Sequence, residues 1–396
     1  MKNQRSEDEI IQNWQIDLAR PTVSIICVTY NHENYIEDAI KGFLIQETDF
    51  PFEILIHDDA STDNTAKIIR QYEKQYPKLF RTIYQTKNQY SKGNKPGQIL
   101  TKMAKGKYIA ICEGDDYWTD PTKLQKQGDY LEAHPDVVIS FFNTNLYYED
   151  TKQFGKLFLK QEKCKNYTAE ELITIPTWLP TSTRVYRNID FGNIPERNKV
   201  LNGDDFLTSI LGNYGGAHYQ NNIEPTIYRV HSEGLWQGIN LQEKLEQHLN
   251  TYFWIYKYYK RIGKNKVASF FFKQYENRLL KLMRLVECNS LNKLITYQSF
   301  NKLESTISNL QQDKMYLVYG YSAFGRYLKA NLKTSFKGFI DLNYKELNLP
   351  DIFSLLDLNK LKYDYIIISL LGREEIITNL LLEHGVKKDK ITYIDI

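Results

Sequence analysis

Three short apolar runs in the first third of the chain share one pattern, because each run ends in a cluster of polar residues. The runs cover 23–28, a stretch that begins at Phe52, and 108–112. Unbroken apolar runs of this length predict strands that are buried on both faces of a sheet. After the first run, the spacing of Ile36, Ile40 and Leu44 predicts a helix. Alternating strands and helices predict an open α/β sheet, in which ligands bind at the carboxyl ends of the strands.

A second strand and helix pattern begins near Asp313 and predicts a small Rossmann-like α/β domain over 313–396. Its first turn keeps the first and third glycines of a dinucleotide-binding pattern, Gly320 and Gly325, but has Ser322 at the middle position. Asp341 follows the next strand, at about the distance expected of a ribose-binding acid. Turn geometry and helix packing explain the same residues without a ligand, so both interpretations stay open.

The segment 240–312 is helical in pattern and basic, with 12 Lys or Arg residues against 5 Glu. Its aromatic residues alternate with cations, a composition that suits contact with anionic lipid at a membrane surface. The alternative is a helical connector whose aromatic side chains pack on the preceding domain. The sequence therefore predicts three parts, at 1–239, 240–312 and 313–396.

Acidic residues follow two of the predicted strands directly. Asp58 and Asp59 come after the second strand, and Glu113, Asp115 and Asp116 come after the third. Carboxylate oxygens at a strand end suit Mg²⁺ or Mn²⁺ on a diphosphate, because these ions keep open positions for phosphate oxygens. A solvated acidic turn is the alternative.

Two further segments carry candidate chemistry. Asp204 and Asp205 begin a predicted helix, where a carboxylate is a candidate general base or simply an acid favoured by the helix dipole. Arg229 and His231 lie on one face of a predicted strand before a loop that contains glycine. Taken by itself, a lone histidine is more often structural.

Together these segments, in this order and spacing, resemble the N-terminal half of family 2 glycosyltransferases of the GT-A fold. The resemblance implies a GT-A nucleotide-sugar-binding domain with a Rossmann-like mixed sheet, a helical connector and a small C-terminal Rossmann-like domain. It places Tyr30 at the nucleotide base, with Thr29 and Asn31 around it, and Asp59 on the uracil with Asp58 beside it. It gives ribose and metal-diphosphate binding to Asp115 and Asp116, with Glu113 where many members have the first Asp of the acidic motif.

The resemblance further implies that Asp205 removes the proton of the acceptor hydroxyl, with Asp204 where Glu is more usual, and that His231 approaches the metal or the diphosphate. It predicts inverting transfer of a sugar from a nucleoside-diphosphate sugar, with UDP as the expected nucleotide and Mn²⁺ or Mg²⁺ as cofactor. The expected acceptor is a glycan or a lipid-linked glycan in cell-surface polysaccharide biosynthesis.

The composition of the chain argues against several other classes of protein. The 396 residues carry a net charge of only +3, which gives no case for nucleic acid binding. The four cysteines have no paired spacing, which argues against a zinc site. No run reaches the roughly 18 apolar residues of a membrane span, and the polar N-terminus does not resemble a secretory signal, so a cytoplasmic location is expected, with peripheral membrane contact if 240–312 binds lipid.

Two other functions stay open at this point. A non-catalytic sugar-nucleotide-binding scaffold would need no base, so the presence of Asp205 argues against it. An NAD-dependent activity in the C-terminal domain would need close approach of the backbone to a pyrophosphate, and Ser322 argues against that. The sugar, the acceptor, the linkage and the oligomeric state do not follow from the sequence.

Overall fold

The computed structural model describes residues 5–14, 19–175, 177–231, 234, 239–285, 307, 310–311, 313–342, 344–347, 349–370 and 373–393. The chain divides into two compact units, Met1–Tyr275 and Glu276–Ile396. The predicted three-part division stays a prediction, and much of the second half of the predicted connector lies outside the described residues.

The main sheet of the first unit has seven strands within the described residues, in the order β3-β2-β1-β4-β8-β5-β9. Its strands are β1 (Val23–Thr29), β2 (Phe52–Asp58), β3 (Phe80–Tyr84), β4 (Tyr108–Ile111), β5 (Val137–Phe141), β8 (Val185–Arg187) and β9 (Gly216–Tyr219). The strands from β3 to β4 run parallel, whereas β8 is antiparallel to both β4 and β5. This is the mixed α/β sheet that the sequence predicted.

The continuous apolar runs behave as expected, because every residue of β2 and all but one of β1 are buried. Helices on the sheet are α2 (Ile36–Leu44), α3 (Thr65–Gln75), α4 (Pro96–Met103) and α5 (Lys123–Ala133), with the short α1 (Glu7–Ile11) near the N-terminus. Their apolar residues join those of the strands in one core, which includes Ile25, Ile54 and Phe43. A sheet covered in this way leaves its polar strand ends as the accessible edge.

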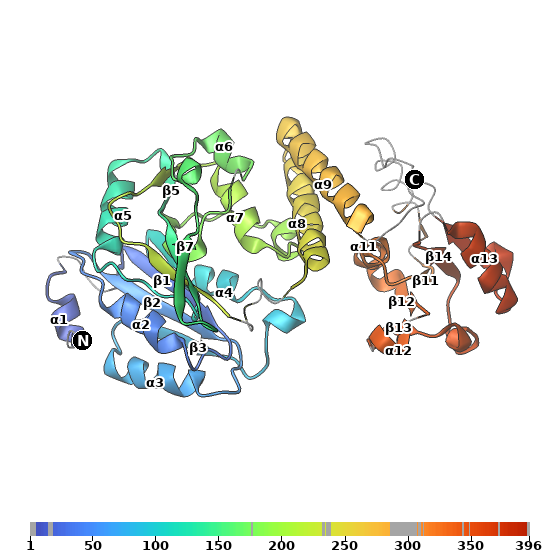
Figure 1. The fold of residues 1–396 in the computed structure, drawn as a ribbon, viewed down its shortest axis with the longest axis horizontal. Helices are drawn as coiled ribbons and strands as arrows, with labels where there is room; N and C mark the ends of the chain where they lie inside the picture. Colours follow the sequence, from blue (N-terminus) through green and yellow to red (C-terminus); the bar gives the residue numbers. More distant parts are fainter. Residues whose placement is uncertain are drawn as a thin grey trace. The chain divides into compact units, whose positions relative to one another are not determined.

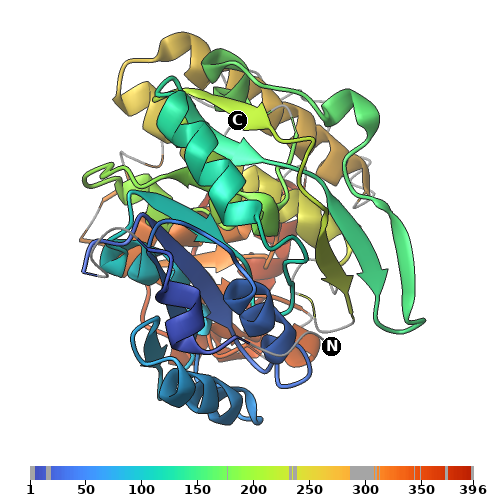
Figure 2. The ribbon, with the colours of Figure 1, turned by 90° about the vertical axis from the view of Figure 1, so that its left-hand side faces the viewer.

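A second, three-stranded sheet lies against this edge. It contains β10 (Thr226–Val230), β6 (Thr144–Tyr148) and β7 (Gln153–Leu157), and β6 and β7 form a hairpin that projects from one side of the unit in Figure 2. The main chain of Tyr117, just after the acidic residues, bridges to Ile227 of β10. The small sheet is therefore joined directly to the acidic segment after β4.

The remaining helices of the first unit are α6 (Ala169–Ile173), α7 (Gly203–Leu211), α8 (Leu241–Arg261) and α9 (Asn265–Leu285), the last of which continues into the second unit. The long helices α8 and α9 lie side by side (Figure 1), with Tyr252 and Tyr256 of α8 against Phe271 and Phe272 of α9. Most aromatic residues of α8 are buried, as the connector interpretation expects. None of the helices in the described part of the chain is long and apolar enough to cross a membrane.

The second unit contains a parallel sheet, with five strands in its described part, in the order β13-β12-β11-β14-β15. The strands are β11 (Tyr316–Tyr319), β12 (Phe336–Ile340), β13 (Ile352–Phe353), β14 (Tyr365–Ile368) and β15 (Ile391–Tyr393), and the helices are α11 (Ala323–Leu332), α12 (Tyr344–Leu347) and α13 (Glu374–Glu383). Numbered within the unit, this strand order is 3-2-1-4-5, which is the order of a Rossmann-like sheet.

Candidate active site

Three polar segments meet at one edge of the main sheet, as the sequence predicted. Strands β2, β1 and β4 are adjacent and parallel, so their carboxyl ends lie side by side. Thr29 at the end of β1 pairs in register with Asp58 at the end of β2. On the other side of β1, the N–H of Gly114 donates to the carbonyl of Val28 at 3.0 Å, which continues the pairing beyond β4. Thr29, Asp58 and the acidic turn are thus neighbours.

Gly114 allows the acidic turn to pack against the end of β1. A Cβ atom at this position would lie 2.7 Å from Oγ1 of Thr29 and 2.9 Å from Nδ1 of His32. These separations are too short for a carbon atom, so the close approach of the two segments requires glycine.

The turns after β1 and β2 are joined by side-chain hydrogen bonds. Asn31 has a positive φ of 55°, its N–H donates to Oγ of Ser61 at 2.9 Å, and its Oδ1 accepts from the N–H of Thr62 at 2.8 Å. The neighbouring Tyr30 is 43% exposed. Of these two predicted base-pocket residues, Asn31 fixes the turn, while the ring of Tyr30 is accessible at the sheet edge.

Two buried acceptors at this edge have no hydrogen-bond partner among the described residues. They are Oγ1 of Thr29 and Oδ1 of Asp58, and both side chains are almost fully buried. Burial raises the pKa of Asp58, and the hydrogen bonds of Ser61 only partly oppose this. An unsatisfied buried polar group costs about 1–3 kcal/mol. A ligand that brings hydrogen-bond donors to this position would remove that cost.

Asp59 holds a loop that the sequence did not connect with the site. Its buried carboxylate accepts the N–H of Gln89 at 2.7 Å and the N–H of Tyr90 at 2.9 Å. Tyr90 begins the short 3-10 helix η1 (Tyr90–Lys92). The predicted uracil-binding acid therefore also anchors the segment between β3 and α4.

The three carboxylates after β4 occupy different environments. Asp116 is 2% exposed, and burial together with the charges of Asp115 and Glu113 raises its pKa well above the usual value. Glu113 reaches solvent at the edge, yet the surrounding protein and the charges of Asp115 and Asp204 raise its pKa to about 8. Burial also acts on Asp115, but the hydrogen bond of His231 and the two histidine charges outweigh it and lower the pKa of Asp115.

His231 lies against the acidic turn, while its predicted contact with a metal or a diphosphate stays a prediction. Nε2 of His231 lies 3.2 Å from Oδ2 of Asp115, and Nε2 of His32 lies 3.8 Å from the same oxygen. The sequence singled out His231 but not His32, which follows Asn31 directly. The sequence feature that could have identified His32 is its position in the polar cluster after β1. Asp115 is thus flanked by two imidazoles.

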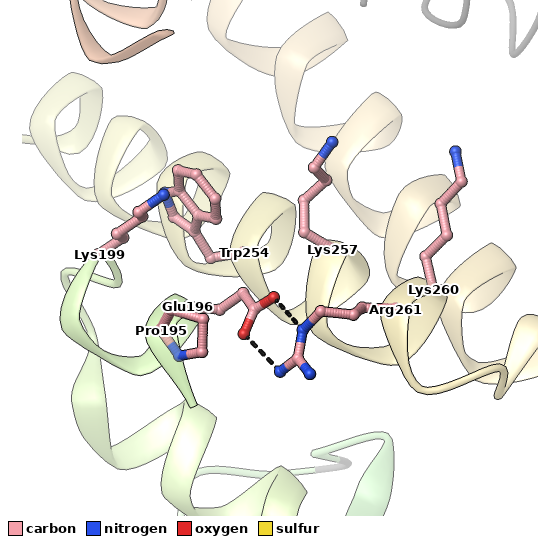
Figure 3. A pocket seen from close by; sticks show the side chains of 7 residues that line it. All are labelled: Pro195, Glu196, Lys199, Trp254, Lys257, Lys260 and Arg261. Carbon is pink, nitrogen blue, oxygen red and sulfur yellow. Dashed lines mark hydrogen bonds and ion pairs between the residues drawn. The ribbon is translucent and has the colours of Figure 1, made fainter. Parts of the chain in front are cut away.

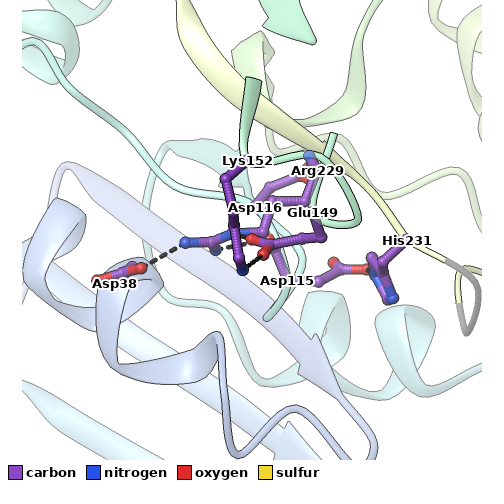
Figure 4. A network of polar contacts seen from close by, with 7 residues as sticks. All are labelled: Asp38, Asp115, Asp116, Glu149, Lys152, Arg229 and His231. Atoms are coloured by element: carbon purple, nitrogen blue, oxygen red, sulfur yellow. Dashed lines mark hydrogen bonds and ion pairs between the residues drawn. The ribbon is translucent and has the colours of Figure 1, made fainter. Parts of the chain in front are cut away.

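Arg229 ties β10 to the acidic turn and is itself almost fully buried (Figure 4). Its backbone N–H donates to Oδ1 of Asp116 at 3.0 Å, and its guanidinium donates to the carbonyl of Asp115 at 2.9 Å. Glu149 and Asp38 accept from the other guanidinium nitrogens. Asp38 and Glu149 gave no signal in the sequence, because they lie on separate elements that only the fold brings together.

Asp204 and Asp205 occupy the first turn of α7, as predicted, in different surroundings. Asp204 accepts a hydrogen bond from Nε1 of Trp178, and Arg184 lies 3.8 Å from it. Asp205 is 8% exposed. The negative charge of Asp204 contributes to the raised pKa of Glu113, so the start of α7 interacts electrostatically with the acidic turn. Thr181, Ser182 and Thr183 form a short 3-10 helix before β8.

Within the described residues, no group of three or more His, Cys, Asp or Glu side chains is arranged to hold a metal ion. An ion at this edge would have one or two carboxylates as protein ligands, which is the arrangement that Mg²⁺ commonly adopts with substrate phosphates.

The comparisons with known proteins bear on this edge of the sheet. Residues 24–190, which contain the three strand ends, match the model for "Glycosyl transferase family 2". A protein of Escherichia coli named UDP-Glc:alpha-D-GlcNAc-diphosphoundecaprenol beta-1,3-glucosyltransferase WfaP is 36% identical over 214 residues, which cover 53% of this chain and 78% of WfaP. The chain belongs to glycosyltransferase family 2.

Two other similarities of this family 2 chain have a smaller matched share of the relative or a lower sequence identity. An uncharacterised protein of Mycobacterium tuberculosis is 35% identical over 220 residues, which cover 54% of this chain and 61% of the mycobacterial protein. The chain thus matches less than two thirds of that relative's length. A crystal structure of residues 1–349 of Staphylococcus aureus TarS with UDP-GlcNAc has a TM-score of 0.47 and 17% identity, and the match covers 79% of this chain and 89% of that TarS chain.

The comparisons confirm the predicted family, and the strand order confirms the mixed α/β fold class of the first unit. The roles of single residues stay predictions. Sequence reasoning overlooked Arg184, which is buried beside Asp204 and donates to the carbonyl of Leu179. A single arginine before a predicted strand gave no sign of burial.

Proposed function

We propose that this chain is an inverting glycosyltransferase that moves a sugar from a UDP-sugar to a hydroxyl of a glycan or lipid-linked acceptor in cell-surface polysaccharide biosynthesis. WfaP is named for such a donor and a diphosphoundecaprenol-linked acceptor, and it shares 36% identity with this chain. The protein would work in the cytoplasm, with peripheral contact at the inner face of the membrane if its acceptor is lipid-linked.

One observation carries the proposal. The carboxyl ends of β2, β1 and β4 bring buried oxygens of Thr29 and Asp58, which have no hydrogen-bond partner in the described part of the chain, next to the acidic turn. Hydroxyl and N–H groups of a nucleoside would satisfy these oxygens, and the acidic turn lies where the diphosphate would follow. Tyr30 offers its exposed ring to the base, and Asp59 would accept from the uracil N–H.

The acidic turn fits a divalent cation as cofactor, Mn²⁺ or Mg²⁺. Burial, together with the charges of neighbouring carboxylates, raises the pKa of Glu113 and Asp116, so a cation bound here would stabilise their ionised forms. Asp115 and Asp116 would hold the ion, with His231 and Arg229 fixing their positions. When bound, such an ion neutralises charge on the diphosphate leaving group.

Asp205 is the proposed base, because a carboxylate within reach of the acceptor hydroxyl removes its proton as the sugar bond forms. One base without a protein nucleophile gives a single displacement with inversion at the anomeric carbon. Asp204 takes no proton from the acceptor in this scheme; its hydrogen bond from Trp178 and its proximity to Arg184 hold the start of α7.

The turn of the second unit is explained without a dinucleotide. Oγ of Ser322 accepts from the N–H of Gly325 at 2.9 Å, and a Cβ on Gly325 would lie 2.3 Å from the carbonyl oxygen of Gly320. Oδ2 of Asp341 accepts from the N–H of Tyr321 at 2.8 Å. Capping of α11, close packing at Gly325 and stabilisation of the turn therefore account for the residues of the glycine pattern. We propose a structural role for this unit.

Calorimetric titration with UDP tests the proposal. We expect binding that strengthens with Mn²⁺ and weakens in excess chelator, and Asp115→Asn should lose this difference because it removes one ligand charge while keeping the size of the side chain. Asp129→Asn, an exposed site on α5, is the matched control. Equal UDP affinity with Mn²⁺ and with chelator in the wild-type protein would contradict the metal assignment.

A further inference from the structure

A basic pocket of about 350 Å³ lies between α8 and the short 3-10 helix η4 (Pro195–Asn198) (Figure 3). Four cationic side chains line it against a single carboxylate. The lining residues are Pro195, Glu196, Lys199, Trp254, Lys257, Lys260 and Arg261. A hollow of this size and charge is suited to an anion.

The single carboxylate is already neutralised within the pocket. Arg261 donates to both oxygens of Glu196, at 2.7 and 2.8 Å, and Glu196 is 7% exposed. A two-pronged pair of this kind occupies the guanidinium plane that would otherwise recognise a planar carboxylate ligand. The excess positive charge therefore belongs to lysines.

Each lysine is held over an aromatic ring. Nζ of Lys199 lies 4.2 Å from the centroid of the Trp254 ring. Nζ of Lys260 lies 5.4 Å from the centroid of the Tyr256 ring and donates to the hydroxyl of this tyrosine at 2.8 Å. Lys257 lies over Phe253 at 5.7 Å. In Figure 3, Lys257 and Lys260 extend in the same direction from successive turns of α8. Ammonium groups are compact point charges, which suit the tetrahedral, multiply charged phosphate group better than a carboxylate.

The pocket is connected to the segment that carries the proposed base. The N–H of Leu201 donates to Oδ1 of Asn250 and the N–H of Asn202 donates to Oγ1 of Thr251, both at 2.9 Å, which ties the chain after Lys199 to α8. Asp205 follows Lys199 by six positions, so their Cα atoms lie no more than about 22 Å apart. A phosphate in the pocket is within an oligosaccharide's reach of the start of α7.

We propose that this pocket binds a phosphate group of the acceptor, so that the acceptor is a phosphate-bearing glycan or polyol. The inference of an anion site rests on the pocket alone, while its link to the acceptor rests on the proposed function. A membrane surface fits less well, because the aromatic residues of α8 are largely buried and leave little apolar surface to insert into lipid.

The test is titration of the full chain with inorganic pyrophosphate while UDP saturates the donor site. We expect binding that weakens as salt rises, and Lys257→Gln/Lys260→Gln should weaken it by about tenfold or more, since two charge-assisted contacts are lost. Lys273→Gln, an exposed lysine on α9 outside the pocket, is the control and should bind like the wild type. Circular dichroism verifies that all variants are folded.

Equal pyrophosphate affinity in the double variant and the control would overturn the anion site. Sedimentation with phosphatidylglycerol vesicles separates the sources: vesicle binding lost in the double variant, without any pyrophosphate binding by the wild type, would overturn the acceptor assignment in favour of a membrane surface. If pyrophosphate binds at this pocket when UDP is omitted and UDP itself does not bind, the anion site stands and the proposed donor chemistry fails.

Discussion

At the scale of single residues, Asp205 separates chemistry from binding. Asp205→Asn keeps the size of the side chain but removes the proton acceptor, so we expect UDP affinity to persist while sugar transfer falls by about 10² to 10⁴. Both quantities are measured on one preparation. Asp204→Asn is the matched variant, one position away on α7, and a larger loss of turnover there than in Asp205→Asn would reverse the two assignments.

Lys123 at the start of α5 is a residue whose burial has a measurable consequence. Its side chain is fully buried, its Nζ lies 4.0 Å from the centroid of the Trp118 ring, and Nζ has no hydrogen-bond partner among the described residues. Burial lowers the pKa of Lys123 from 10.5 to about 7. At pH values between these two pKa values, Lys123 is therefore largely deprotonated in the folded protein but protonated in the unfolded chain.

Because the unfolded chain binds more protons in this interval, the free energy of unfolding should rise with pH from about 7 towards 10, by up to ~1.4 kcal/mol per pH unit from this group. Lys123→Met should flatten that rise and be the more stable protein near pH 7. Denaturant titrations of both proteins at several pH values provide the comparison. Parallel curves for the two proteins would mean that Lys123 keeps an ordinary pKa.

At the scale of elements, the acidic turn depends on β10 through Arg229. Arg229→Lys keeps the charge but not the planar donors that reach Asp115, Glu149 and Asp38. We expect Mn²⁺-dependent UDP affinity to fall about tenfold, or ~1.4 kcal/mol. Lys152→Gln is the control, because Lys152 also pairs with Glu149 but is exposed. Similar losses of UDP affinity in both variants would show that the affinity depends on the pairing of Glu149 and not on the contacts of Arg229 with the acidic turn.

The strands around the site were predictable because each is a short apolar run with its polar residues at one end, as in β1 and β2. The insertion of antiparallel β8 between β4 and β5 could not be predicted, because the sequence of a three-residue strand does not identify the strands it pairs with. The same limit applies to side chains. The position of Asp115 at a strand end followed from its motif, whereas the pairing of Arg229 with Asp38 depends on residues 191 positions apart.

At the scale of the whole molecule, the two units have separate cores and separate sheets. All residues of the proposed nucleotide site belong to the first unit. A chain ending after residue 312 should therefore bind UDP as the full chain does, which titration of both proteins measures. Stoichiometric NAD binding by the full chain at micromolar concentration, abolished by Gly320→Ala, would instead give the second unit a catalytic or regulatory role.

The carboxylate of Asp59 has a consequence beyond its place at the sheet edge. It accepts the N–H groups of Gln89 and Tyr90 and is also the group proposed to meet the nucleotide base. Order in the segment between β3 and α4 and occupancy of the nucleotide site therefore act on one another through a single side chain. Such coupling has the same free energy in both directions. Amide exchange at Gln89 and Tyr90 would respond to UDP, and replacements that stiffen this segment would change UDP affinity without touching the nucleotide.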